Sequence, residues 1–158
     1  MSKAADLCED GKYRKALSLY NQILKAKPEH LDALIDKGVA LQNMGSLKQA
    51  LSCFHKAVEV DPKNVTALLN KGSVLHGLGR FDDAISCYEQ VLSIEKKSAM
   101  ALAYKGLSLG EKGMIKEALI FFKKALQIDK DYDLALMSKE IATKLLKQIK
   151  EETEKTRS

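Results

Sequence analysis

The sequence is poor in several features, and each shortage argues against a class of protein. It has no tryptophan, only two prolines, and 6% aromatic residues. No apolar run approaches the roughly 18 consecutive residues that a membrane-spanning helix needs, and the first residues lack the apolar stretch of a secretory signal. We therefore expect a cytoplasmic protein with no membrane partner.

Residues that could carry chemistry are also few and scattered. The chain has three cysteines and three histidines, namely Cys8, Cys53, Cys87, His30, His55 and His76. None of the cysteines forms a Cys-x-x-Cys pair, and the histidines lack metal-ligand spacing. No His-Glu-x-x-His, phosphate-binding glycine loop or Gly-x-Ser-x-Gly is present either. We expect reduced, packed thiols and no catalytic residue, metal site, cofactor or enzymatic activity.

The charge gives little support to a nucleic-acid partner. The 26 basic and 21 acidic residues leave a net charge of +5, and both signs are interspersed along the chain. Such mixing is typical of solvated helix faces. No basic block with interleaved aromatic residues appears, although that pattern is expected of a nucleic-acid surface.

What the chain does have is internal repetition with a period of 34 residues. Four ladders keep this interval: Gly11, Gly45, Gly79 and Gly113; Ala16, Ala50, Ala84 and Ala118; Tyr20, Phe54, Tyr88 and Phe122; and Gly38, Gly72 and Gly106. Repeats of this length are typical of stacked helical units that each bury a face against the next. Such an array offers a long binding surface rather than an enclosed catalytic pocket.

Each repeat is predicted to be a helical hairpin. Apolar residues at helical spacing predict a first helix over residues 31–44 and a second over 47–60, broken between them by Gly45. Asp61 and Pro62 end the second helix. A glycine in the middle of each first helix costs about 1 kcal/mol against alanine, so we expect the second helix to approach closely there, with its alanine facing the glycine.

The repeats predict one array over residues 1–150. Its parts are a partial first repeat at 1–30, full repeats at 31–64, 65–98 and 99–132, and a capping helix at 133–150. Glu140 replaces the mid-helix glycine in the last segment, which suits a helix that no partner covers. We expect residues 151–158 to be frayed or disordered. Whether the array continues beyond Met1 stays open.

The combination of mid-helix glycine, turn glycine, small alanine, aromatic residue and terminal proline resembles the tetratricopeptide repeat. This resemblance implies an all-α fold, a right-handed superhelical solenoid of antiparallel helix hairpins with a C-terminal capping helix. The chain departs from the family pattern at several places, where Leu34, Leu68 and Leu102 replace the usual tryptophan, Lys96 and Lys130 replace proline, and Lys37, Lys71, Lys105 and Lys139 form a lysine ladder. We expect the lysine stems to pack while their ammonium groups reach water.

The resemblance also implies a function, because such proteins are mostly binding modules whose first helices line a concave groove. Carried onto this sequence, the groove positions are Ile35, Asp36, Val39, Leu69, Asn70, Ser73, Met100, Ala103, Tyr104 and Leu107, with Met137 and Ile141 as a possible extension. This largely apolar set suits a peptide or an amphipathic helix of another protein. Some of its apolar members could instead pack between repeats.

One family branch binds the acidic tails of heat-shock chaperones with lysine, asparagine and arginine at defined groove places. The corresponding residues here are Ile35, Val39, Asn70, Met100 and Tyr104, and only Asn70 matches. Binding of a chaperone C-terminal tail is therefore disfavoured. Two alternatives to the peptide-binding scaffold remain, a self-assembling homo-oligomer joined through its terminal helices or groove, and nucleic-acid binding through the lysine ladder.

Overall fold

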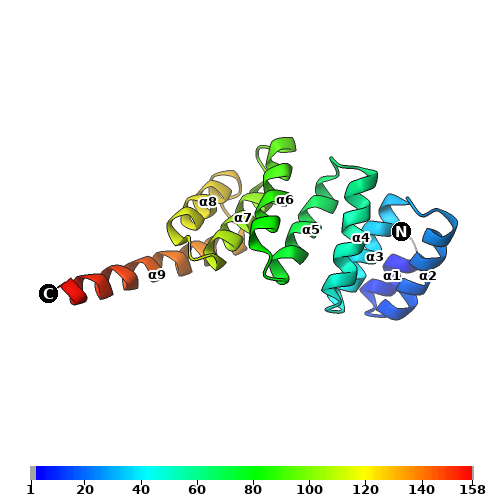
Figure 1. Cartoon of the computed structure of the whole chain (residues 1–158), viewed down its shortest axis with the longest axis horizontal. Coiled ribbons are helices and arrows are strands. Elements are labelled where there is room, and N and C mark those ends of the chain that lie inside the picture. The colour runs from blue at the N-terminus through cyan, green and yellow to red at the C-terminus, as the bar shows by residue number, and fades with distance from the viewer. Residues whose placement is uncertain (1–2, 158) are drawn as a thin grey trace. The chain divides into compact units, whose positions relative to one another are not determined.

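The computed structural model describes residues 3–157 and contains only helices in that range (Figure 1). The helices are α1 (Lys3–Glu9), α2 (Tyr13–Ala26), α3 (Leu31–Asn43), α4 (Leu47–Val60), α5 (Val65–Gly77), α6 (Phe81–Ile94), α7 (Ala99–Glu111), α8 (Ile115–Ile128) and α9 (Asp133–Arg157). The predicted second helix of residues 47–60 matches α4, and the predicted first helix of residues 31–44 exceeds α3 by one residue. None of the described helices is long and apolar enough to cross a membrane.

Contacts divide the chain into two compact units, residues 1–80 with α1–α5 and residues 81–158 with α6–α9. The boundary falls between the two helices of the repeat predicted at residues 65–98. The sequence period alone predicts one array over residues 1–150, because periodicity reports equivalent positions and carries no information on how tightly neighbouring repeats cohere.

In the unit of residues 1–80, each helix packs against the next one along the chain, and α3 also contacts α5. The core of this unit is built from small and large residues in contact, including Leu34, Ala50, Phe54, Ala57 and Val74. Four of these belong to α3 and α4, whose short connection turns the chain back on itself. The first helix therefore lies with one side against its own second helix.

Local signals at the helix ends fix these boundaries. The Nδ1 atom of His30 accepts a hydrogen bond from the backbone N–H of Ala33 at 3.3 Å, and Oδ1 of Asn64 accepts one from Ala67 at 2.9 Å. These are N-cap interactions, which satisfy backbone donors that a helix start leaves unpaired. The turn glycines at the other end have positive φ angles, from 71° at Gly11 to 79° at Gly113, a conformation that glycine adopts without steric penalty.

The mid-helix glycines have a different partner from the predicted one. A methyl group at Gly38 would lie 2.6 Å from Cε1 of Phe54, and one at Gly106 would lie 2.6 Å from Cε1 of Phe122. The nearest atoms to these glycines therefore belong to the aromatic ladder, and not to the alanine ladder that the sequence predicts to face them. Ala118 instead lies near Gly110, one turn further along α7.

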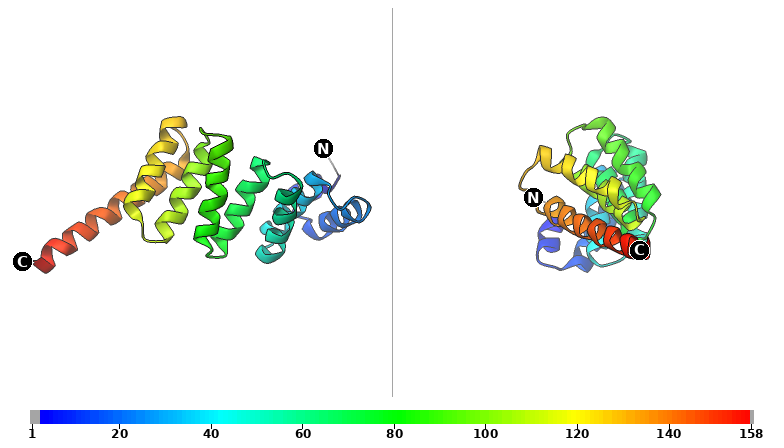
Figure 2. Two further views of the ribbon diagram at one scale, coloured as in Figure 1. Left: turned by 45° about the horizontal axis from the view of Figure 1, so that its top comes forward. Right: turned by 90° about the vertical axis from the view of Figure 1, so that its left-hand side faces the viewer.

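In the unit of residues 81–158, α6, α7, α8 and α9 pack in chain order, and α7 also contacts α9. Figures 1 and 2 show α9 continuing as one helix past the end of α8. It runs to Arg157, whereas the sequence predicts a frayed or disordered segment from residue 151, and Ser158 lies outside the part that the structure describes. The segment has no glycine or proline, and Lys147 and Lys150 lie 4.0 and 3.9 Å from the carboxylates of Glu151 and Glu154, a spacing that supports an exposed helix.

Candidate binding site

The predicted groove residues of the first unit lie on α3 and α5. Ile35 is buried, with 9% of its surface exposed, and it packs in the core with Leu34 and Phe54. The other members of this set, Asp36, Val39, Leu69, Asn70 and Ser73, are half-buried and so retain surface that a ligand could contact. Ile35 therefore belongs to the core beneath this surface.

A cleft of about 560 Å³ opens beside Asp36. Its walls come from α2, α3 and the start of α5, and its lining residues are Tyr20, Ile23, His30, Asp32, Ala33, Ile35, Asp36, Asn64 and Thr66. Two of the predicted site residues, Ile35 and Asp36, thus share this cleft. The size is within the usual range for sites that hold a small molecule or a few side chains.

The cleft carries negative charge. Burial raises the pKa of the Asp36 carboxyl, the neighbouring Asp32 raises it further, and His30 acts in the opposite direction. The pKa of the Tyr20 hydroxyl is also raised, first by burial and then by the charge of Asp36. Within residues 3–157, neither Asp32 nor Asp36 has a cation within ion-pair distance in the structure. A positively charged group in the cleft would act to lower the raised pKa of both Asp36 and Tyr20.

Polar side chains of α5 are held by hydrogen bonds. The Asn70 amide donates from Nδ2 to the carbonyl oxygen of Thr66 at 3.0 Å, which leaves its Oδ1 atom available as an acceptor. Nε2 of Gln42, on α3, donates to Oγ of Ser73 at 3.1 Å. This bond links α3 to α5 through the Ser73 hydroxyl.

The predicted groove residues of the second unit differ in exposure. Met100 is 44% exposed, Tyr104 and Leu107 are half-buried, and Ala103 is fully buried. The Tyr104 ring lies 5.7 Å from that of Tyr88, centroid to centroid, and is tilted by 40°, within the favourable range for aromatic pairs. Ala103 thus brings the backbone of α7 close to the core, while Met100 and Tyr104 offer contact surface.

The capping helix adds an apolar face to this unit. Leu107 lines a smaller cleft of about 240 Å³ together with Ile115, Phe122, Ile141 and other residues of α7, α8 and α9. Met137 and Ile141, the two residues predicted to extend the groove, are 64% and 57% exposed. Ile141 therefore stands at the edge of an open apolar cleft.

Sequence reasoning missed several lining residues of the cleft beside Asp36. Asp32 lies four residues before Asp36 and therefore on the same side of α3, so its position could have been read from helical spacing. Tyr20 and Thr66 had no such signal, because they reach the cleft from other helices. No cluster of metal-ligating side chains occurs among the described residues.

Comparison with known proteins identifies the family of this chain. A tetratricopeptide repeat profile matches residues 29–97 and again residues 63–131, and a second profile with the same description matches residues 3–42. This chain belongs to the tetratricopeptide repeat family. The hairpins of 34 residues and the glycine, alanine and aromatic ladders are therefore the family's repeat, and the sequence prediction of the family is confirmed. A search of curated proteins gives no match.

Solved structures with the same fold include other tetratricopeptide repeat proteins. A crystal structure of MamA matches with a TM-score of 0.81 at 21% identity, covering 100% of this chain and 99% of MamA. MamA from Desulfovibrio magneticus RS-1 gives 0.76 at 19% identity, covering 98% and 93%. The first repeat domain of RPAP3, solved with the HSP90 peptide SRMEEVD, gives 0.70 at 20% identity, covering 73% and 92%. At these identities the likeness establishes the all-α repeat fold.

Proposed function

We propose that this protein is a non-catalytic interaction module, which binds a peptide or an amphipathic helix of another protein on the exposed faces of its first helices. The observation that carries the proposal is the cleft beside Asp36, which is open, bordered by half-buried polar residues, and negatively charged without a cation of its own. A partner segment with a basic residue at this point would complete the charge. Membership of a family of binding modules supports the same function.

The partner class follows from the charges on this surface. The RPAP3 domain was solved with a peptide whose sequence, SRMEEVD, ends in acidic residues. At the places where a chaperone-binding groove has lysine, asparagine or arginine, this chain has Ile35, Val39, Asn70, Met100 and Tyr104, and only Asn70 matches. An acidic tail would also meet Asp36 and Asp32, and like charges repel. We therefore propose a basic or amphipathic partner rather than an acidic chaperone tail.

Capture of partners from the native extract, with variants as matched baits, tests this function. Asp36→Arg and Asn70→Arg each place a cation on the proposed surface, while Gln127→Arg makes a comparable charge change on exposed α8. We expect the wild type and Gln127→Arg to retain the partner and both groove variants to lose it. The affinity of each groove variant for the partner should fall at least about tenfold, as for removal of a charge-assisted contact. A partner retained equally by all four baits would refute this surface.

Far-UV circular dichroism of each variant separates loss of binding from loss of folding. All three arginines replace side chains that are exposed or half-buried, so we expect wild-type helix content. Isothermal titration with the captured partner then gives the affinity of each variant directly. A groove variant that is unfolded is replaced by Asp36→Asn, which keeps the side-chain shape and removes only the charge.

Self-association is a second candidate function, favoured by the exposed face of α9. Along this helix, Met137, Ile141, Leu145 and Ile149 recur every four residues and are 40–64% exposed. A stripe of this kind is commonly covered by another helix. Sedimentation velocity at rising concentration tests this, with Ile141→Glu against Ile120→Glu on α8 as a control at similar exposure. A wild-type protein that stays monomeric at high concentration would exclude self-association.

The lysine ladder gives nucleic-acid binding the weakest support. Its four lysines are all half-buried, and Nζ of Lys105 lies 2.7 Å from a carboxylate oxygen of Glu89. Cations that are partly covered or already paired offer fewer contacts to phosphates. Filter binding of this chain to DNA at several salt concentrations should therefore show no steep salt dependence.

A further inference from the structure

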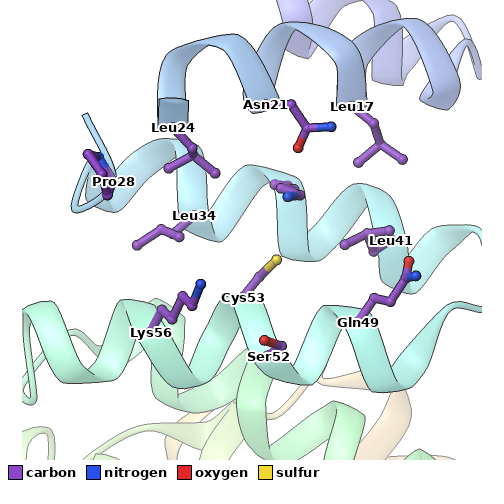
Figure 3. A pocket seen from close by; sticks show the side chains of 11 residues that line it. Leu17, Asn21, Leu24, Pro28, Leu34, Leu41, Gln49, Ser52, Cys53 and Lys56 are labelled. Carbon is purple, nitrogen blue, oxygen red and sulfur yellow. The ribbon is translucent and has the colours of Figure 1, made fainter. Parts of the chain in front are cut away.

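A second cleft lies in the unit of residues 1–80, away from the cleft beside Asp36. It runs between the second helices α2 and α4 and is floored by α3, with a volume of about 490 Å³ (Figure 3). We call it the α2–α4 crevice. Leucines from α2 and α3, such as Leu24 and Leu34, form apolar walls, while Lys37 and Lys56 bring positive charge and Cys53 lies between α3 and α4.

At the equivalent place two repeats later, the protein supplies its own partners for the lysines. In the unit of residues 81–158, Nζ of Lys105 lies 2.7 Å from a carboxylate oxygen of Glu89 and 4.5 Å from the centre of the Phe121 ring. Nζ of Lys124 lies 5.2 Å from the same ring centre. The Lys105 side chain is only 15% exposed as a result. Here a carboxylate pairs with Lys105, and one aromatic ring lies within cation–π distance of both lysines.

The α2–α4 crevice keeps the two cations and lacks both partners. Subtracting 68 residues, which is two periods of 34, carries Lys105 and Lys124 onto Lys37 and Lys56. The same step carries Glu89 onto Asn21 and Phe121 onto Cys53. A neutral amide thus replaces the carboxylate, and a small thiol replaces the ring. Both replacements are smaller than the side chains they replace, which is consistent with the open crevice in this unit.

The two lysines of this crevice affect the pKa of the Cys53 thiol that lies inside it. Burial raises the pKa of the Cys53 thiol, while the ammonium groups of Lys37 and then Lys56 act to lower it. Both cations therefore lie near this thiol, which is only 7% exposed. No carboxylate lies within ion-pair distance of either lysine among the interactions that the structure shows for residues 3–157. A thiol with a raised pKa stays protonated, so it does not neutralise them.

We propose that the α2–α4 crevice binds a segment of another protein that presents a carboxylate next to an aromatic ring. The carboxylate would pair with Lys37 as Glu89 pairs with Lys105, and the ring would lie over Cys53 beneath Lys56. Charge complementarity selects an acidic group, and the leucine walls select an apolar neighbour. This site has the opposite charge preference to the cleft beside Asp36, so it stands independently of the function proposed above.

Nuclear magnetic resonance titration with a short peptide tests the proposal. The probe is acetyl-Ser-Glu-Phe-Ser-amide, and its analogues carry Gln in place of Glu or Ala in place of Phe. We expect amide shifts at Asn21, Lys37 and Cys53, and an affinity for the parent peptide at least about fivefold above that for either analogue, in line with charged and cation–π contacts. Equal affinity for all three peptides, or shifts confined to other residues, would overturn the proposal.

Two variants of the protein complete the test. Lys37→Met removes the cation and keeps an apolar stem, so the parent peptide should lose at least about fivefold in affinity. Lys48→Met removes a cation at an exposed position of α4 outside the crevice, and this variant should bind the peptide as the wild type does. Unchanged affinity in Lys37→Met would count against the site whatever the peptide analogues show.

The double variant Asn21→Glu, Cys53→Phe supplies the two missing side chains from within. We expect it to lose binding of the parent peptide and to unfold at a higher temperature than the wild type, because the crevice is then occupied. A double variant that is folded and binds the peptide with wild-type affinity would contradict the proposal. Asp36→Arg changes the cleft beside Asp36 and should leave binding of the peptide to the α2–α4 crevice intact. The function proposed for the cleft and the binding proposed for the crevice can therefore fail independently of each other.

Discussion

The close approach of Phe122 to Gly106 leads to a quantitative prediction. Gly106→Ala would add a methyl group 2.6 Å from Cε1, 2.9 Å from Cδ1 and 3.1 Å from Cζ of Phe122. These separations are far below van der Waals contact, and the ring is only 3% exposed, so it has little room to move. Overpacking of this kind costs about 1–3 kcal/mol.

The same substitution also has a favourable effect, because alanine stabilises a helix interior by about 1 kcal/mol over glycine. The net change in the free energy of unfolding is therefore a loss of about 0–2 kcal/mol, from the difference of these two values. Gly110→Ala provides the matched control on the same helix. Its methyl group would find its nearest neighbour, Cβ of Ala118, at 3.9 Å, so only the helix-propensity gain of up to about 1 kcal/mol applies.

Urea unfolding monitored by circular dichroism measures both variants, with fluorescence of the tyrosines as a second probe. We expect Gly106→Ala to be less stable than Gly110→Ala by about 1–3 kcal/mol, the overpacking term alone. In Gly106→Ala, Phe122→Leu, the smaller side chain should make room for the methyl group, so the two changes should be non-additive. If Gly106→Ala is as stable as Gly110→Ala, the steric explanation of the mid-helix glycine is refuted.

Three further predictions concern charge, backbone conformation and the C-terminal segment. Burial raises the pKa of Asp36 in the folded state, so the native protein holds its proton to higher pH than the unfolded chain does. The stability that this carboxyl contributes is present at low pH and is lost as the pH rises through the raised pKa. Asp36→Asn should therefore unfold at a higher urea concentration than the wild type at pH 7, and this difference should shrink toward pH 3. A difference that stays constant with pH would contradict this. Gly113 has φ 79° and an added methyl group would meet nothing within 4 Å, so Gly113→Ala should lose about 1–2 kcal/mol through backbone strain alone, and Gly113→Asn, which tolerates this conformation better, should lose less in the same urea assay. Deletion of residues 151–158 removes helical turns whose side chains at residues 151–155 are exposed, so helix content should fall while the urea midpoint stays within error; a clear drop in the midpoint would show that the segment stabilises the fold.

Comparison of particular residues shows why some parts were predictable. The ends of α4 followed from Gly45 before it and Asp61-Pro62 after it, since glycine and proline act locally on the backbone. The groove positions could be assigned by register, but their exposure could not. Ile35 and Ala103 look like their neighbours in sequence and yet are buried, because burial depends on which side chains the facing helices supply. The part of α9 beyond residue 150 differs from the predicted frayed segment, because ion pairs between exposed side chains are weak signals in a polar sequence.

The family, the helical hairpins and the 34-residue register follow from the amino-acid sequence, because they depend on local conformation and on periodic burial. Packing of the helices determines that ring atoms of Phe54 and Phe122 are the nearest neighbours of Gly38 and Gly106. It also decided which clefts stay open. Lys37 and Lys105 are equivalent in the repeat, but only Lys105 has a carboxylate and a ring against it. That difference arises from residues on two neighbouring helices, far from the lysine in sequence, and it becomes visible only when those helices are packed together.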